Sequence, residues 1–298
     1  MLYYFIINGR EDIRARADAF LDAQLGQYDI DCRKYYTEGV GDGTRMVRMY
    51  CDLYPRDEVC FVACGGSGTV NEVASGIAGS TGKSMAILAF GETNDAIKYW
   101  PDRNFNDLGR ILDGEHAKVD LIKAGNSYCF NVINVGFDAM VAYDALRLMD
   151  RGLPAVKAYR RAVITGLFRY RTNGISATVD GVHFAKRHVM MCPMGNGQWC
   201  GGQFHCLPGA VNDDGLIDIL VVKRMSLLTC LIFFASYLKG EHLQNKFVRK
   251  RCKLLRARSV KLMSKDLIYL CIDGEITASR AFDIDILPGE INLIVPAL

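Results

Sequence analysis

The sequence of 298 residues has no apolar run long enough to cross a bilayer. Its longest one, from Leu227 to Leu238, is interrupted by Thr229 and Ser236, whereas a membrane-spanning helix needs about 20 apolar residues. The first residues, MLYYFIINGRED, lack the basic start of a signal peptide and are expected to form a first strand. We therefore expect a soluble, cytoplasmic protein.

A disulfide framework is also not expected. The eleven cysteines are an odd number and include no C-x-x-C pair, which is typical of reduced thiols in a reducing compartment. The tightest mixed cluster is Cys192, Cys200, His205 and Cys206, preceded by His188. It lacks the paired spacing of zinc ligands, and we interpret these residues as buried or incidental.

Charge of one sign is not in large excess, because 36 Lys and Arg residues stand against 33 Asp and Glu residues. The formal net charge of +3 gives no indication of nucleic acid as a partner. The positive charge is unevenly distributed, however. The segments Lys157 to Arg171 and Lys246 to Arg258 carry a disproportionate share of it.

What the sequence does contain, over about its first 120 residues, is a regular alternation of short strand-like runs and helix-like stretches. The strand-like runs are LYYFII, CRKYYT, VCFVAC and MAILAF, and the helices follow them at Asp12 to Gly26, Arg45 to Leu53, Asn71 to Ala78 and Asp95 to Trp100. This rhythm predicts a mostly parallel, doubly wound sheet of the α/β class, whose ligands bind at the carboxyl ends of the strands.

After Asp120, strand-like segments follow one another, and only two helical stretches interrupt them, Asp138 to Arg171 and Ser226 to Arg251. This pattern predicts a second, predominantly antiparallel β-domain with helical insertions. A chain of this length favours two domains. We place them at residues 1–120 and 121–287, with a last strand at 288–298 that returns to the first domain.

The sharpest local signal is a glycine-rich turn, Cys64-Gly65-Gly66-Ser67-Gly68-Thr69, between the buried strand VCFVAC and a helix that opens with Asn71 and Glu72. Glycines let backbone N–H groups approach an anion closely, and the helix N-terminus adds partial positive charge. The turn therefore predicts a phosphate site. The alternative is that the glycines only let the helix pack closely on the sheet.

A second turn of this kind follows MAILAF and reads Gly91-Glu92-Thr93-Asn94-Asp95. In a parallel sheet it can lie beside the first turn and face the same ligand. Gly41-Asp42-Gly43-Thr44 follows a polar segment instead of a buried strand, so we interpret it as a turn into the helix at Arg45.

Together these segments resemble the diacylglycerol kinase catalytic family, which includes soluble bacterial lipid kinases, sphingosine kinases and ceramide kinases. GGSGTVNE and GETND correspond to the family's G-G-D-G-T-x-N-E and G-T-x-N-D. The later segments NVGFDAMV, Gly195-Asn196-Gly197, Gly201-Gly202, LPGAVNDDGLIDILVV and Asp273-Gly274-Glu275 continue the resemblance in the family's order. It implies a Rossmann-like first domain of the NAD kinase and diacylglycerol kinase type and an antiparallel β-sandwich as the second domain.

The resemblance also implies ATP and Mg²⁺ as cofactors. It places around the nucleotide Asn8, Gly9, Arg10, Thr37, Gly65, Gly66, Ser67, Gly68, Thr69, Asn71, Glu72, Gly91, Glu92, Thr93, Asn94 and Asp95.

In the family, a carboxylate of the D-G-E element takes the proton from the lipid hydroxyl. Carried over to this chain, the resemblance makes Glu275 the general base, with Asp273 beside it organising Mg²⁺ or water and Asp138 as a further catalytic residue. Phosphoryl transfer needs such positioning, a divalent cation and a base. An alternative for Asp273-Gly274 is an ordinary hairpin turn.

The family also has a structural metal site in the second domain. The resemblance implies the carboxylate of Asp214 and the backbone carbonyls of Val211 and Leu216 as its ligands, an oxygen set suited to Mg²⁺ or Ca²⁺. The alternative is a plain turn with solvated charges.

Three departures from the family pattern lie on the nucleotide side. Ser67 replaces an aspartate and cannot supply negative charge to a cation. Glu92 replaces a threonine that contacts the nucleotide, and Asn8-Gly9-Arg10 shortens the family's N-P-x-S-G turn. Arg10 offers a positive charge for the phosphates, although a solvated arginine is the simpler interpretation.

These departures leave two hypotheses of different classes. The first is an ATP-dependent kinase that phosphorylates a membrane lipid hydroxyl of the diacylglycerol type in the interdomain cleft. The second is a weak or inactive relative that binds nucleotide or lipid as a regulatory module. NAD kinase, which shares the G-G-D-G-T loop and the two-domain plan, is a minor third.

A lipid substrate requires contact with a bilayer. The helix Lys157 to Tyr170 interleaves basic residues with Tyr159 and Leu167, and the segment from Lys246 is strongly basic, so both predict a peripheral, salt-sensitive membrane surface. Each could instead be a solvated face. The sequence does not decide whether two copies form a homodimer.

Overall fold

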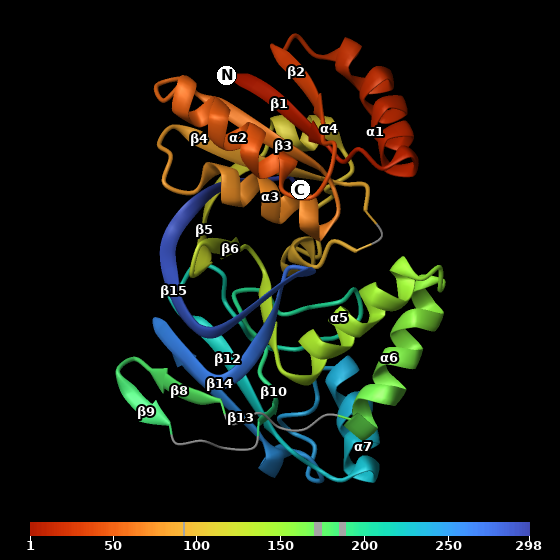
Figure 1. Cartoon of the computed structure of the whole chain (residues 1–298). Helices are drawn as coiled ribbons and strands as arrows, with labels where there is room; N and C mark the ends of the chain where they lie inside the picture. The colour runs from red at the N-terminus through yellow and green to blue at the C-terminus, as the bar shows by residue number, and fades with distance from the viewer. Residues whose placement is uncertain (92, 170–174, 185–188) are drawn as a thin grey trace.

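The computed structural model describes residues 1–91, 93–169, 175–184 and 189–298, and the chain forms two halves stacked one above the other (Figure 1). The elements of the N-terminal half are β1 (Leu2–Ile7), α1 (Glu11–Gln24), η1 (Leu25–Gln27), β2 (Cys32–Tyr36), α2 (Asp42–Leu53), β3 (Val59–Gly65), α3 (Ser67–Ile77), β4 (Lys83–Ala89), η2 (Ala96–Tyr99) and α4 (Leu108–Leu112).

The rest of the chain is richer in strands. Its elements are β5 (Glu115–Ala124), β6 (Ser127–Cys129), β7 (Val132–Val135), α5 (Phe137–Asp150), α6 (Ala155–Arg169), β8 (Ser176–Val179), β9 (Val182–Phe184), β10 (Val189–Met191), β11 (Met194–Gly195), β12 (Ile217–Lys223), α7 (Leu227–Leu238), η3 (Arg249–Arg251), β13 (Cys252–Ala257), β14 (Ser259–Ile272) and β15 (Glu275–Val295).

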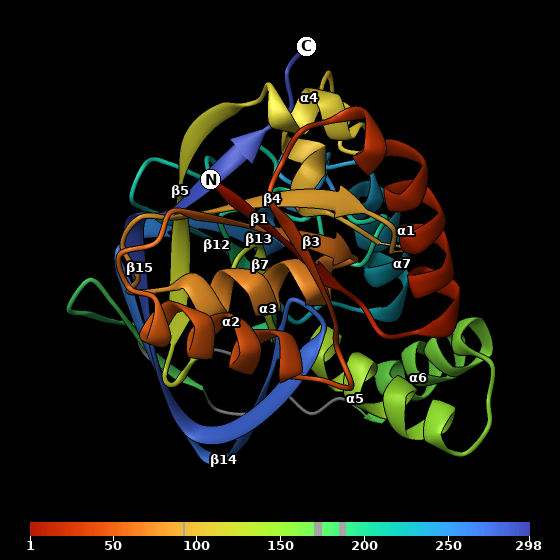
Figure 2. The ribbon, with the colours of Figure 1, turned by 90° about the horizontal axis from the view of Figure 1, so that it is seen from above.

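The N-terminal sheet is parallel and covered on both faces. Its strand order is β15-β4-β3-β1-β2, and each of these neighbouring pairs is parallel. Figure 2 shows α2 and α3 on one side of the strands and α1 and α4 on the other. The predicted doubly wound α/β architecture is therefore confirmed.

The sequence of β3 explains this double covering. Every residue of β3 is buried, as expected for a parallel strand with helices on both faces. Phe61 and Ala63 join the core under α2 and α3, whereas Cys60 and Val62 join the core under α1 and α4. The continuous apolar run VCFVAC is thus divided between two cores by the period of two along a strand.

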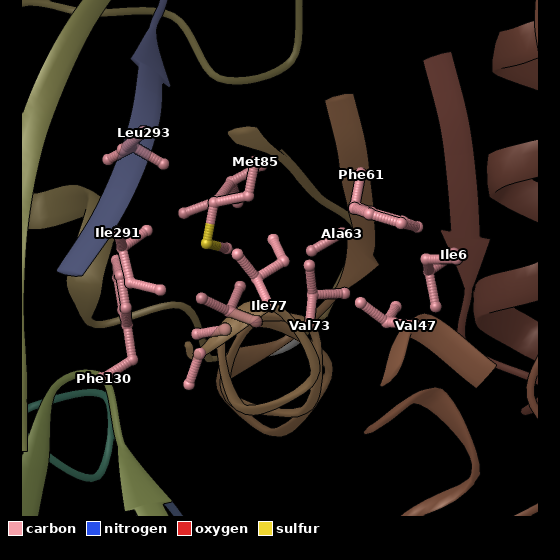
Figure 3. Close-up of a cluster of buried hydrophobic side chains, with 14 of the residues drawn as sticks. Ile6, Val47, Phe61, Ala63, Val73, Ile77, Met85, Phe130, Ile291 and Leu293 are labelled. Atoms are coloured by element: carbon pink, nitrogen blue, oxygen red, sulfur yellow. The ribbon is translucent and has the colours of Figure 1, made fainter. Parts of the chain in front are cut away.

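The core under α2 and α3 also contains residues from the end of the chain. Figure 3 shows Ile291 and Leu293 of β15 beside Met85 of β4 and Ile77 of α3, with Phe130 close to Ile291. These side chains are at most 4% exposed. The N-terminal half is therefore completed by segments that follow it in the sequence.

The second half is antiparallel, as predicted. Its strands follow the order β10-β12-β11-β7-β14-β15, all neighbours being antiparallel, with β13 paired to β12 and β8 to β14. Helices α5, α6 and α7 gather along one side of it (Figure 1).

The first predicted helical interruption is divided in two, and the second is shorter than predicted. The stretch from Asp138 contains two helices because Gly152, at φ +87°, and Pro154 break it. The stretch from Ser226 ends as a helix at Leu238, just before Gly240 at φ +75°. Residues 170 and 171 lie outside the described residues.

One strand runs through both halves. β15 pairs first with β14, then with β5, and its end meets β4 at Leu293 opposite Met85 (Figure 1). Because the sheet is continuous, it does not mark a domain boundary between the halves. The division at residues 120 and 287 stays a prediction.

We predict that Leu293→Ala destabilises the protein by about 2–5 kcal/mol, since Leu293 is fully buried and its truncation leaves a cavity beside β4. Urea unfolding measures the free energy. The matched control is Leu298→Ala, the same change at a residue that is 77% exposed, which should leave stability within about 0.5 kcal/mol. Equal effects of the two substitutions would contradict the packing of β15 into the N-terminal core.

Candidate active site

The carboxyl ends of β1, β2 and β3 lie side by side, and the first predicted nucleotide residues meet there. Asn8, after β1, donates from Nδ2 to Oγ1 of Thr69 at 3.0 Å. The amide of Gly9 donates to Oγ1 of Thr37, after β2, at 3.1 Å. A Cβ on Gly9 would lie 1.8 Å from the Thr37 carbonyl oxygen, so this close approach requires glycine.

The side chain of Arg10 is engaged with a neighbour. Its Nε and one terminal nitrogen each lie 3.2 Å from the carboxylate of Asp12, and the guanidinium is 59% exposed. The structure places Arg10 at the rim of the strand ends, next to Asn8, whose Oδ1 accepts its amide at 3.1 Å.

The two predicted glycine-rich turns pack backbone against backbone. The amide of Gly91 donates to the carbonyl of Gly65 at 2.9 Å. A Cβ on Gly91 would lie 2.3 Å from Cα of Gly66, so no larger residue fits there without a shift of the backbone. A Cβ on Gly68, in the first turn of α3, would meet no atom within 4 Å. The N-terminal end of α3 thus borders open space.

Ser67 ties the first turn to the second one. Its amide donates to the carbonyl of Thr93 at 3.0 Å, its hydroxyl lies 3.4 Å from the same oxygen, and it accepts the amide of Asp95 at 3.4 Å. Ser67, which stands where the family has aspartate, therefore bonds to Thr93 and Asp95 of the second turn. Glu92, the second departure, lies outside the described residues.

The second turn also contacts the C-terminal half. Asp95 accepts from Nζ of Lys98 at 2.7 Å and from the amide of Gly202 at 2.9 Å, and Lys98 donates to the Gly202 carbonyl at 2.7 Å. Asn94 is buried beside Gly65, with Nδ2 3.5 Å from its carbonyl oxygen. The Gly201-Gly202 segment thus lies against the second glycine-rich turn.

Glu72 contacts the start of α2 through its carboxylate. Its carboxylate accepts the amides of Gly41 at 2.8 Å and Gly43 at 2.9 Å, at the N-terminal end of α2. The segment Gly41 to Thr44 is the start of α2, which begins at Asp42 and not at Arg45, and Gly41 has a φ of +81°. Burial raises the pKa of Glu72, although the two amides oppose the shift.

Asp273 lies in a nest of backbone amides. Its Oδ2 accepts from Phe130 at 2.8 Å and Asn131 at 3.0 Å, and its Oδ1 accepts from Val132 at 2.9 Å. The residue itself has a φ of +46°, in the left-handed region, within the turn between β14 and β15. Burial raises the pKa of Asp273, whereas these amides favour the charged form. These three hydrogen bonds tie the turn between β14 and β15 to residues 130–132.

The amide of Phe130 is shared between the two halves. It donates both to Asp273 and to Oδ1 of Asn71 on α3, the latter at 3.0 Å. Next to it, the Asn131 carbonyl accepts the amide of Asn196 at 3.0 Å, and Nδ2 of Asn131 donates to Trp199 at 2.9 Å. Residues 129–132 therefore connect α3, the D-G-E turn and the Asn196 loop.

Glu275 lines a cavity of about 420 Å³ between α2, α3, the β5–β6 connection and the start of β15. The lining residues are Gly41, Thr44, Arg48, Asn71, Glu72, Ser75, Asn126, Ser127, Tyr128, Ile272, Glu275, Ile276 and Thr277. The predicted base thus shares one cavity with Asn71 and Glu72, which follow the glycine-rich turn. Partial burial raises the pKa of Glu275, and the negative charges of Glu72 and Asp273 raise it further.

Asp138 lies in the first turn of α5. Its Oδ1 accepts the amide of Ala139 at 3.0 Å, and its Oδ2 is buried with no hydrogen-bond partner among the described residues. Burial raises the pKa of Asp138 to about 7. Asp138 is not among the described residues that line the Glu275 cavity, but its charge acts on Cys271, two residues before Asp273.

In the turn predicted to bind a metal, the guanidinium group of Arg256 lies beside the carboxylate of Asp214. Asp214 accepts the amide of Leu216 at 3.0 Å, and the Arg256 guanidinium contacts its other oxygen. Nε of Arg256 also lies 3.2 Å from the carboxylate of Asp218, which is only 2% exposed. A cation there would keep only the carbonyls of Val211 and Leu216 as unopposed donors, so these residues do not fit Mg²⁺ or Ca²⁺.

Two further observations concern metals and thiols. Within the part of the chain that the structure describes, no group of three or more His, Cys, Asp or Glu side chains could hold a metal ion. All eleven cysteines are free, and Cys206 is buried while Cys192 and Cys200 are half-buried. His188 lies outside the described residues.

Two organising residues were missed by the sequence analysis. Asp120, 1% exposed, accepts the amides of Gly215 at 2.6 Å and Gly289 at 2.7 Å and so holds two distant turns. Asn131 connects the segments described above. The available signal was a polar residue inside an apolar run, KVDLI for Asp120 and CFNVI for Asn131, because a buried polar group needs partners.

No helix among the described residues has the length and apolar character needed to cross a membrane. Residues 3–124 match the family described as the diacylglycerol kinase catalytic domain, and residues 131–295 match the YegS C-terminal NAD kinase beta sandwich-like domain.

Curated relatives match along almost the whole chain. A probable lipid kinase YegS-like protein of Xanthomonas euvesicatoria is 28% identical over 291 residues, covering 93% of this chain and 87% of the relative. A protein of the same description from Pseudomonas syringae is 27% identical over 292 residues, covering 96% and 90%.

Solved structures agree in fold. A diacylglycerol kinase from Bacillus anthracis superposes with a TM-score of 0.71 at 20% identity, covering 98% of this chain and 96% of that one. A putative diacylglycerol kinase from the same organism gives a TM-score of 0.73 at 20% identity, covering 99% and 96%. The chain therefore belongs to the diacylglycerol kinase catalytic family, as a kinase of its lipid kinase group with a YegS-type C-terminal domain.

Proposed function

We propose that this protein is an ATP-dependent lipid kinase that transfers the γ-phosphoryl group of ATP to the hydroxyl of a diacylglycerol-type lipid, in the cavity between the two halves. The observation that carries the proposal is the position of Glu275. It lines the same cavity as Asn71 and Glu72, which follow the glycine-rich turn on α3. The names of the relatives, which are lipid and diacylglycerol kinases, support the choice of acceptor.

The backbone of the two glycine-rich turns is suited to phosphates. The missing Cβ atoms at Gly66 and Gly91 let the turns pack together, and the N-terminal end of α3 borders open space at Gly68. An anion there would meet the positive end of the helix dipole. In this proposal, the turns bind the phosphates while Asn8 and Thr37 hold the strand ends in register.

Glu275 acts as the general base. Its raised pKa increases its affinity for the proton of the lipid hydroxyl, yet the carboxylate is charged at pH values above that pKa. Asp273 does not take the proton in this proposal. Its carboxylate is bonded to the amides of Phe130, Asn131 and Val132 and holds the turn that carries Glu275.

Mg²⁺ bound with ATP would neutralise phosphate charge during transfer. Most carboxylates of the predicted site are already engaged, because Glu72 holds the start of α2 and Asp95 is paired with Lys98. Glu275 lines the cavity together with Glu72 and is suited to share in holding the ion.

The alternative is a weak or inactive member that binds nucleotide or lipid as a regulatory module. The observation that favours it is Ser67, whose hydroxyl is bonded within the loop and supplies no negative charge to a cation. NAD phosphorylation remains the minor alternative, since the second half matches a domain described as NAD kinase-like.

We also propose that the protein is cytoplasmic and associates peripherally with the inner face of the membrane. On α6, Tyr159 and Ile164 are 45% and 50% exposed beside the exposed Arg160. In the other basic segment, Phe247 is 64% exposed, and Lys246 lies 5.2 Å from its ring centre. Exposed apolar side chains among basic ones are suited to an anionic lipid surface.

We predict that Glu275→Gln lowers kcat by about 10²–10⁴-fold, the usual contribution of a general base. The assay follows radiolabelled γ-phosphate from ATP with Mg²⁺ into mixed micelles that contain diacylglycerol, monoacylglycerol, ceramide or sphingosine. The matched control is Glu115→Gln, the same change at a carboxylate that is 74% exposed and does not line the cavity. Its kcat should equal that of the wild type.

Other outcomes of this assay discriminate the alternatives. A silent wild type that becomes active with Ser67→Asp and Glu92→Thr would mean that the fold was kept while its nucleotide chemistry was lost. Label transferred to NAD, and to none of the lipids, would establish the NAD kinase alternative.

We predict that Glu72→Gln moves the acidic limb of the pH–rate profile to lower pH. The charge of Glu72 raises the pKa of Glu275, so its removal lowers that pKa and leaves the base deprotonated in more acidic solution. The profile of kcat/KM against pH measures the shift. An unchanged acidic limb in an active variant would show that Glu275 is not the group that titrates there.

We predict that the protein co-sediments with liposomes containing anionic lipid at low salt and is released as salt increases, because screening weakens the attraction of its basic segments. Phe247→Ser should reduce the bound fraction, whereas Val40→Ser, at an exposed apolar residue of the N-terminal half, should not. Absence of binding at low salt would contradict peripheral association.

A further inference from the structure

A second hollow lies between α5 and α6, away from the Glu275 cavity. It has a volume of about 330 Å³ and is lined by Asp144, Arg147, Leu148, Arg151, Arg161 and Thr165. We call it the arginine cleft. None of these residues lines the candidate active site, and Figure 1 shows α5 and α6 as neighbouring helices at the periphery of the molecule.

The cleft gathers positive charge. Among the described residues, three guanidinium groups and one carboxylate line it, which gives these side chains a net charge of about +2. Within the described residues, no ion pair joins Arg147, Arg151 or Arg161 to a carboxylate. Like charges that line one hollow repel one another, and an anion between them removes that cost.

The helices place these groups in register. Arg147 and Arg151 are four residues apart at the end of α5, and Asp144 lies one turn before them on the same face. Arg161 lies on α6 beside the fully buried Ala162, which packs in the core that the two helices share. Arg147 and Arg161 therefore project from packed helices, and Arg151 directly follows the last residue of α5.

The cleft is also linked to the hairpin formed by β14 and β15. The Arg147 guanidinium lies 5.7 Å from the ring centre of Tyr143, and Tyr143 contacts Tyr269 of β14 at 4.9 Å between ring centres. β14 continues to the turn that carries Asp273. One end of α5 thus lines the cleft, and its first turn carries Asp138.

The chemistry of the cleft selects for phosphate. Guanidinium groups form paired hydrogen bonds with phosphate oxygens, and Arg is the preferred residue for such recognition. The Thr165 hydroxyl donates to its own helix, to the Arg161 carbonyl at 2.9 Å, so the donors available to a ligand are the guanidinium groups. The volume is in the range of small-molecule sites.

From the converging guanidinium groups, the volume and the helix register, we infer that the arginine cleft binds a phosphate group through Arg147, Arg151 and Arg161. Two sources carry this chemistry, the headgroup of a membrane phospholipid and free phosphate. The exposed Ile164 lies three residues from Arg161, on the same side of α6. Because binding needs no turnover, the inference can be tested even if the kinase proposal fails.

The test compares wild type with the triple variant Arg147→Gln, Arg151→Gln and Arg161→Gln. The matched control is Arg33→Gln, Arg56→Gln and Arg280→Gln, which removes the same charge at three exposed positions outside the cleft and outside both basic segments. One arm measures binding of inorganic phosphate by calorimetry at constant ionic strength. The other measures sedimentation with phosphatidylcholine vesicles that contain either phosphatidic acid or oleic acid.

We expect the cleft variant to bind phosphate, or phosphatidic acid vesicles, more than about 10-fold less tightly than the control variant does. Loss confined to the vesicle arm, with oleic acid vesicles unaffected, identifies a phospholipid headgroup as the source, and loss in the calorimetric arm identifies free phosphate. Equal losses in the two variants, or no binding by wild type in either arm, would overturn the inference.

A second variant guards against misfolding. Substitution of all three arginines by lysine keeps the charge but removes the planar fork of donors. We expect it to fold, as judged by circular dichroism, and to bind phosphate more weakly than wild type but more tightly than the glutamine variant. Binding equal to that of wild type would show that only net charge matters and would contradict a site that recognises phosphate through paired guanidinium hydrogen bonds.

Discussion

The carboxylate of Asp273 is the constraint on which the candidate site depends. A buried carboxylate is costly unless hydrogen bonds satisfy it, and here three consecutive amides, of residues 130–132, do so. The same amides belong to the segment that connects β6 to β7 and to the first residue of β7. Because Phe130 also donates to Asn71, one set of hydrogen bonds aligns the start of α3 with the hairpin of Glu275. The glycine-rich turns and the proposed base thereby keep fixed positions relative to each other, although they come from opposite halves of the chain.

Much of this arrangement follows from local sequence patterns. The buried runs of β3 and β4 predict adjacent parallel strands, and adjacent strands bring the glycine turns at Gly65 and Gly91 together. The prediction that Glu275 is the general base depended on the resemblance to the family, because Asp-Gly by itself also indicates an ordinary hairpin turn.

The rest depends on contacts between residues far apart in the sequence. Nothing around Glu72 indicates that its carboxylate holds the start of α2, 29 residues earlier at Gly43. Likewise, the turn at Asp214 reads as a metal turn until Arg256, 42 residues later, is seen to contact it. Local patterns predict where elements begin and end, whereas the partner of a charged side chain is chosen by the fold as a whole.

The long course of β15 has a consequence for how the chain folds. Its last residues pair with β4 and fill the core under α2 and α3, so the N-terminal sheet lacks a strand until the end of the chain emerges from the ribosome. During synthesis, the edge of β4 would stay unpaired, and such edges attract other strands. Contacts of this sequence separation also slow folding, because the chain must close a very large loop before they form. Folding of the first half is therefore coupled to completion of the second.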